Sequence, residues 1–148
     1  MRQVVYAMRF EGRADPLGPD GKVLKATAAS PSTAVTSAVG RDGLDGRVEA
    51  IVGDRATFES EMTFTGRNAY LEHGWIAFGN RHRLHFVTVG SGYLGPGPDP
   101  TRQHGSATWR IEGGDGQFAD ASGLITSNLI VGPEDGITSH HCGVIFLP

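Results

Sequence analysis

The sequence predicts an all-β protein, in the form of a single antiparallel barrel of about eight strands. Glycine is the first reason: the chain has 22 glycines in 148 residues, roughly double the usual share of about 7%. The second is that these glycines separate short runs rich in Val, Ile, Thr and Phe, while no run has the period of an amphipathic helix. Short turns between such runs imply antiparallel neighbours, so the sheet is expected to close into a barrel, with a β-sandwich as the alternative.

The expected strands follow one another along the whole chain. Pro31 separates two runs of small residues and makes a long helix there unfavourable. Residues 41–46 contain two Asp-Gly pairs, which predict a hairpin turn. Residues 91–105 form the longest turn-like segment, which we expect to be a lid over one barrel mouth, with His104 near a ligand or simply in solvent. The strands are expected at residues 3–12, 22–30, 33–40, 47–53, 54–66, 68–79, 82–90, 106–114, 122–132 and 137–148.

Residues 54–66 show the clearest alternation between two faces of a strand. One face is largely apolar and is expected to be buried, while the other is polar and is expected to face water. The apolar face comprises Ala56, Phe58, Ser60, Met62 and Phe64, and the polar face comprises Thr57, Glu59, Glu61, Thr63 and Thr65.

Composition restricts the classes of partner and location. The formal net charge is −3 and the 13 Lys and Arg residues are scattered, so a nucleic-acid partner is not expected. One cysteine cannot form an internal disulfide. The first twelve residues show no signal-peptide core, and no apolar run has the ~18 residues of a membrane span. We therefore expect one domain, residues 1–148, in the cytoplasm and away from membranes.

Residues Trp109–Asn128 carry a family resemblance. A strand ends in a glycine turn, then Gly116, Phe118, Ala121 and Gly123 form a Gly-x-Phe-x-x-Ala-x-Gly motif, and a β-branched strand follows. This hairpin resembles that of the allene oxide cyclase and dirigent barrels. The resemblance implies an eight-stranded barrel with an apolar cavity, often dimeric or trimeric. It also implies cyclisation or isomerisation of a hydrophobic substrate without a cofactor.

Ionisable residues near aromatic ones are the candidates for acid–base catalysis. Glu72 shares a predicted strand face with Tyr70, and an apolar pocket would raise its pKa towards neutrality. His73 lies on the opposite face of that strand, and His85 has β-branched neighbours further along its own face. The catalytic hypothesis assigns proton transfer to Glu72 with His73 or His85. The structural alternative for each histidine is a rim or core side chain hydrogen-bonded to a carbonyl.

The C-terminal strand adds His140, His141 and Cys142 as candidates. In a strand, His140 and Cys142 share one face and His141 lies on the other, so at most one histidine faces the cavity. A zinc site needs three or four ligands, and no spacing motif supplies them, so we expect no metal. Cys142 is too far from His140 for a direct hydrogen bond, about 7 Å, and is expected to pack as a small apolar residue.

The leading functional hypothesis is therefore a cofactor-free isomerase, cyclase or lyase that binds a small hydrophobic molecule. Large aromatic side chains would line its cavity, although each could equally be ordinary core. These candidate ligand-binding residues are Tyr70, Trp75, Phe86, Tyr93 and Trp109.

Two alternatives remain open: a non-catalytic carrier of an apolar ligand, and a structural oligomer whose barrel is packed solid. A homodimer or homotrimer is expected because the last strand is apolar on both faces. Either Val144 and Phe146 or Ile145 and Leu147 would meet a neighbouring subunit.

Overall fold

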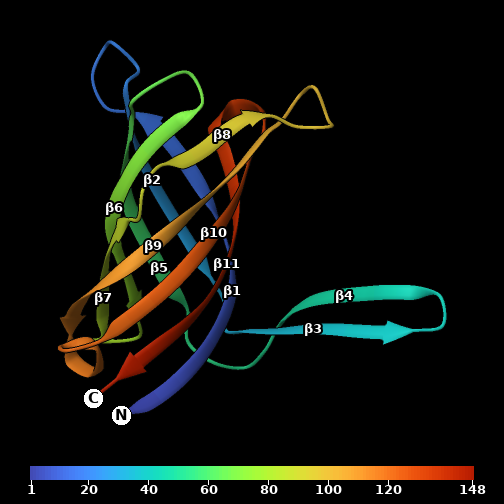
Figure 1. Ribbon diagram of the computed structural model, residues 1–148, viewed down its shortest axis with the longest axis vertical. Helices are drawn as coiled ribbons and strands as arrows, with labels where there is room; N and C mark the ends of the chain where they lie inside the picture. The colour runs from blue at the N-terminus through green and yellow to red at the C-terminus, as the bar shows by residue number, and fades with distance from the viewer.

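The computed structural model describes residues 1–148 and shows a closed eight-stranded antiparallel barrel rather than a sandwich (Figure 1). The first and last barrel strands pair over nearly their whole length, and this pairing closes the sheet. The structure contains no helix that could span a bilayer. Around the barrel the strands are β1 (Arg2–Pro16), β2 (Val23–Ser30), β5 (Ala56–Phe64), β6 (Ala69–Phe78), β7 (Arg83–Thr88), β9 (Gln103–Asp115), β10 (Ser122–Val131) and β11 (Gly136–Leu147).

A ninth strand, β8 (Gly92–Pro96), pairs with β9 and with the start of β6. The prediction of one long loop at 91–105 was therefore wrong, because β8 and the start of β9 form a hairpin within it. His104 is exposed and lies on β9, opposite Gly95 of β8.

The strands β3 (Thr33–Gly40) and β4 (Gly43–Ala50) form a separate two-stranded sheet. We call this hairpin, residues 33–50, the arm. It projects from the barrel beside the N-terminal half of β1 (Figure 1). The turn of the arm is at Arg41 and Asp42, and the second Asp-Gly pair lies inside β4.

The alternation predicted for residues 54–66 is confirmed, with Ala56, Phe58, Ser60 and Met62 buried in the barrel. Every barrel strand turns alternate side chains inward, and aromatic rings fill the centre. The Trp109 ring stacks on Phe86, with ring centroids 4.0 Å apart. An eight-stranded barrel is just wide enough to be filled by side chains. The lumen accordingly retains a small void beside Glu72, described below.

The motif at residues 116–123 closes one end of the barrel. Gly116 and Gly123 both have positive φ, which glycine adopts without strain. Phe118 is buried, and its ring contacts that of Phe78 at 5.4 Å. The glycines thus turn the chain and the phenylalanine plugs the lumen.

Candidate functional site

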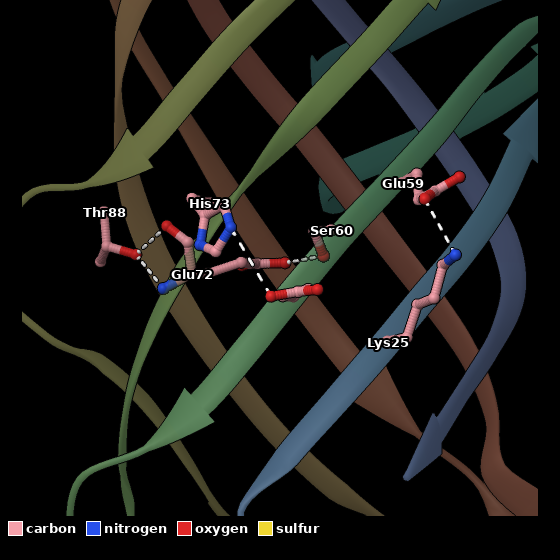
Figure 2. Close-up of polar contacts among 7 residues, drawn as sticks. Lys25, Glu59, Ser60, Glu72, His73 and Thr88 are labelled. Carbon is pink, nitrogen blue, oxygen red and sulfur yellow. Dashed lines mark hydrogen bonds and ion pairs between the residues drawn. The ribbon is translucent and has the colours of Figure 1, made fainter. Parts of the chain in front are cut away.

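The candidate site is centred on Glu72, a carboxyl that is buried in the lumen. Ser60 Oγ donates to Glu72 Oε1 at 2.6 Å, and Trp109 Nε1 donates to Glu72 Oε2 at 3.0 Å. Thr88 fixes the backbone at this point, since its hydroxyl bridges the amide and the carbonyl of Glu72 at 2.6 and 2.8 Å (Figure 2). Both carboxyl oxygens therefore have a donor, and the residue is held in one position.

Burial raises the pKa of Glu72 to about 7, because desolvation disfavours the charged form. The hydrogen bonds from Ser60 and Trp109 act in the opposite direction, since they stabilise the carboxylate. At neutral pH both protonation states are populated, and the carboxyl can act as a general acid or a general base.

His141 is the second buried ionisable group in the lumen. Its Nδ1 lies 3.0 Å from the hydroxyl of Tyr6, while its Nε2 has no hydrogen-bond partner. The ring stacks on Phe10, with centroids 4.5 Å apart. Burial, with a smaller contribution from the charge of His140, lowers the pKa of His141 to about 3. The imidazole is therefore neutral at physiological pH.

Trp109 lies between these two buried groups. Its indole N–H binds Glu72, and its ring meets the His141 ring edge-to-face at 4.9 Å. A void of about 10 Å³ adjoins Glu72, which is room for about one water molecule. Ser127 and Ser139 line this void and are hydrogen-bonded to each other at 2.8 Å.

The other predicted histidines lie outside the barrel. His73 Nε2 is 3.7 Å from Glu61, and His85 Nε2 is 3.8 Å from Asp115, all with exposed side chains. Figure 2 shows His73 and Glu72 leaving β6 on opposite sides of the wall. The expected pairing of Glu72 with His73 or His85 is thus not assembled, because neighbours on a strand point to opposite faces.

His140 also faces outward, as does Cys142. The expectation that Cys142 packs as a small apolar residue was wrong, because the outward side of β11 leaves it exposed. The C-terminal strand therefore divides as predicted, and it is His141 that enters the lumen. No group of three or more His, Cys, Asp or Glu side chains is placed to hold a metal ion.

Three of the five predicted ligand-binding aromatic residues, Tyr70, Phe86 and Trp109, are inside the barrel. Burial, and secondarily the charge of Glu72, raises the pKa of Tyr70. Trp75 is on the outer surface, where the Arg83 guanidinium lies 4.2 Å from its ring centroid. Tyr93 is about half exposed on β8.

Three residues that hold the site were not singled out from the sequence: Tyr6, Ser60 and Thr88. Ser60 had a detectable signal, since it is the one hydroxyl on the apolar face of residues 56–64. A polar residue on a buried face needs a hydrogen-bond partner, which here is Glu72. Tyr6 gave no such signal, because its contact with His141 depends on pairing between the two ends of the chain.

A hollow of about 490 Å³ lies at the side of the barrel, next to β1 and the root of the arm. Tyr6 and Phe78 line it, with ring centroids 5.5 Å apart, and Tyr6 also contacts His141 in the lumen. None of the predicted site residues lines it. Comparisons of this chain with models of known protein families, with curated proteins and with solved structures found no match.

Proposed function

We propose that this chain is a cofactor-independent acid–base enzyme in which Glu72 moves a proton on a small hydrophobic molecule, in an isomerisation, cyclisation or lyase step. The observation that carries this is a buried carboxyl whose pKa is about 7. A catalytic acid or base works best when its pKa is close to ambient pH. Perturbed groups of this kind gather at functional sites.

The surroundings of Glu72 set the class of substrate. Apart from two serines, the void beside it is lined by aromatic and aliphatic side chains, which favours a small apolar molecule. Because the void itself holds only about one water, the substrate must displace a side chain. Met62 borders the void and is unbranched and adaptable. The hollow outside Tyr6 and Phe78 offers a route inward.

The proton balance needs no co-reactant. Glu72, as carboxylate, removes a proton from a carbon of the substrate and, as carboxylic acid, returns it at another position. Ser60 and Trp109 stabilise the carboxylate through their hydrogen bonds. His141 stays neutral, and its free Nε2 is available to hydrogen-bond the polar end of the substrate.

The filled lumen favours a second candidate, a structural barrel with no ligand inside. In that case Glu72 would be a buried polar group of the core. A non-catalytic carrier lies between the two, because it would bind the same molecules and leave them unchanged.

Hydrogen–deuterium exchange into small enolisable ketones separates these functions. We expect wild-type protein in D₂O to catalyse exchange, followed by NMR, with a rate that changes around pH 7. Glu72→Gln should lower that rate by ~10²–10⁴-fold. Glu59→Gln is the matched control, because Glu59 lies on the adjacent strand but points outward to Lys25 at 3.0 Å (Figure 2).

Exchange that is equally fast with Glu72→Gln would overturn the assignment of Glu72. A thermal shift with the same ketones but no exchange would indicate a carrier. The absence of both a thermal shift and exchange would indicate a solid barrel. Both of these outcomes contradict the enzymatic proposal.

A further inference from the structure

The arm has one apolar face and one charged face, although both are surrounded by solvent. Cross-strand pairing places Val35 opposite Val48 and Val39 opposite Leu44, so these four side chains share a face. Val39 is 86% exposed and Leu44 is 76% exposed. An isolated two-stranded hairpin is at best marginally stable in water. The apolar face of the arm is thus the kind of surface that a partner covers.

The charged face of the arm contrasts with it. Asp45, Arg47 and Glu49 alternate with the apolar residues along β4 and pair with small residues of β3. This alternation is that of a strand with one buried and one solvated face. The arm thus has the pattern of a half-buried sheet, although its apolar face is not covered within the single chain.

A second uncovered apolar surface lies on the barrel wall. In the register of β1, β11 and β10, Val5 is opposite Val144, and Val144 is opposite Leu124, so the three form a row across the outer face. Val5 is 74% exposed and Leu124 is 52% exposed. Phe146 is also on this outward face. We call Val5, Leu124, Val144 and Phe146 the wall row.

These outward positions settle a choice that the sequence left open. Ile145 and Leu147 are buried in the lumen, while Val144 and Phe146 point away from it. The outward pair is the one available to another molecule.

The apolar face of the arm turns towards this same side of the barrel. A cleft of about 100 Å³ at the root of the arm is lined by Val48 and Ala50 from the apolar face. Its other side is formed by Arg9 and Glu11 on the outer face of β1. The root of the arm and the outer face of β1 therefore form the two sides of one cleft.

We propose that these two apolar surfaces bind a second copy of the chain, with the apolar face of each arm covering the wall row of the other copy. A two-fold axis brings the same patch of both chains together, so one dimer makes both arm–wall contacts. Each chain offers one face of the two eight-residue arm strands and the outward residues of β1, β10 and β11. Together these residues approach the ~20–30 residues a side of a stable interface. The charged arm face remains in water.

The molar mass in solution, measured by light scattering after gel filtration, tests the pairing. We expect wild-type protein to have the mass of two chains. The double variant Val39→Asp/Leu44→Asp should weaken the dimer at least ~100-fold and elute as a monomer. Both side chains are exposed in the single chain, so the barrel should still fold, which circular dichroism checks. Ala38→Asp is the control, because it adds a charge to the other face of the same arm and should leave the dimer intact.

Mixing variants tests which surfaces meet. Leu124→Asp damages the wall row and should also give a monomer. A mixture with the arm variant should recover dimer, because the intact arm of one copy can cover the intact wall of the other. Wild-type protein that is monomeric at ~100 µM overturns the proposal and leaves the surface to a different partner. The proposal is also overturned if the arm variant is still a dimer, or if the mixture of the two variants forms no dimer. None of these outcomes depends on catalysis by Glu72.

Discussion

Glu72 and His141 lie in one lumen, both are buried, and both contact Trp109. Desolvation is the largest cause of the pKa shift of each. It favours the neutral form in both cases, which raises the pKa of the acid to about 7 and lowers that of the base to about 3. Only the pKa of the carboxyl is shifted towards neutral pH. The same burial therefore makes Glu72 able to exchange protons and makes His141 unable to.

The two groups also have opposite effects on stability as pH changes. The folded-state pKa of Glu72 is above its ordinary value of 4.5, so its contribution is fully present below pH 4.5 and is lost as pH rises through about 7. The folded-state pKa of His141 is below its ordinary value of 6.5, so its contribution is present above pH 6.5 and is lost as pH falls through about 3. Between pH 4.5 and 6.5 the two effects oppose each other.

The largest expected effect comes from removing the residue that separates the two groups. Trp109→Ala deletes a buried indole that stacks on Phe86 and takes away one of the two donors to Glu72. We expect the free energy of unfolding to fall by about 3–5 kcal/mol. Chemical denaturation at pH 7 measures this loss. Trp109→Phe keeps a ring without the N–H and should cost less, and equal losses would show that packing contributes little.

An intermediate effect is expected when the carboxyl alone is neutralised. Glu72→Gln cannot ionise, so it should remove the loss of stability that wild-type protein shows between pH 4.5 and 7. The difference in unfolding free energy between the variant and wild type should change by about 3 kcal/mol from pH 4 to pH 8, in favour of the variant at high pH. Urea denaturation across this range provides the measurement.

Glu59→Gln is again the control. Glu59 is on the outer face, in an ion pair with Lys25, and such surface pairs contribute ~0–1 kcal/mol. A pH-independent difference for Glu72→Gln would show that Glu72 is not titrating in this range, and it would remove the contrast with His141.

Strand faces could be predicted from the sequence because side chains alternate strictly along a strand. The opposite orientations of Glu72 and His73, and of His140 and His141, follow from this rule alone. This rule does not show which of the two faces lines the lumen, because alternation separates the faces without identifying the inner one. Ser60 was the nearest clue, because it lies on an otherwise apolar face and pairs with Glu72 across two neighbouring strands.

The arm shows the other limit of prediction. Its residues alternate as a barrel strand would, and strands were expected there. The local sequence pattern is the same for apolar side chains that face a lumen and for Val39 and Leu44. In the single chain these two side chains face solvent. The filled lumen was equally inaccessible, since it depends on how rings such as Phe58, Phe86 and Trp109 stack after the two ends of the chain have paired.

The smallest expected effect comes from the single hydrogen bond of His141. Tyr6→Phe removes the hydroxyl 3.0 Å from Nδ1 and leaves the imidazole with no hydrogen-bond partner. We expect a loss of about 1 kcal/mol in unfolding free energy. Desolvation rather than Tyr6 lowers the pKa of His141. The decrease in unfolding free energy as pH falls below 6.5 should therefore be the same in the variant as in wild type. Denaturation at pH 7 and pH 5 distinguishes the two contributions. A loss that shrinks strongly from pH 7 to pH 5 would mean that Tyr6 helps to keep His141 neutral, and the two buried groups would then differ in their hydrogen bonds as well as in the sign of their charge.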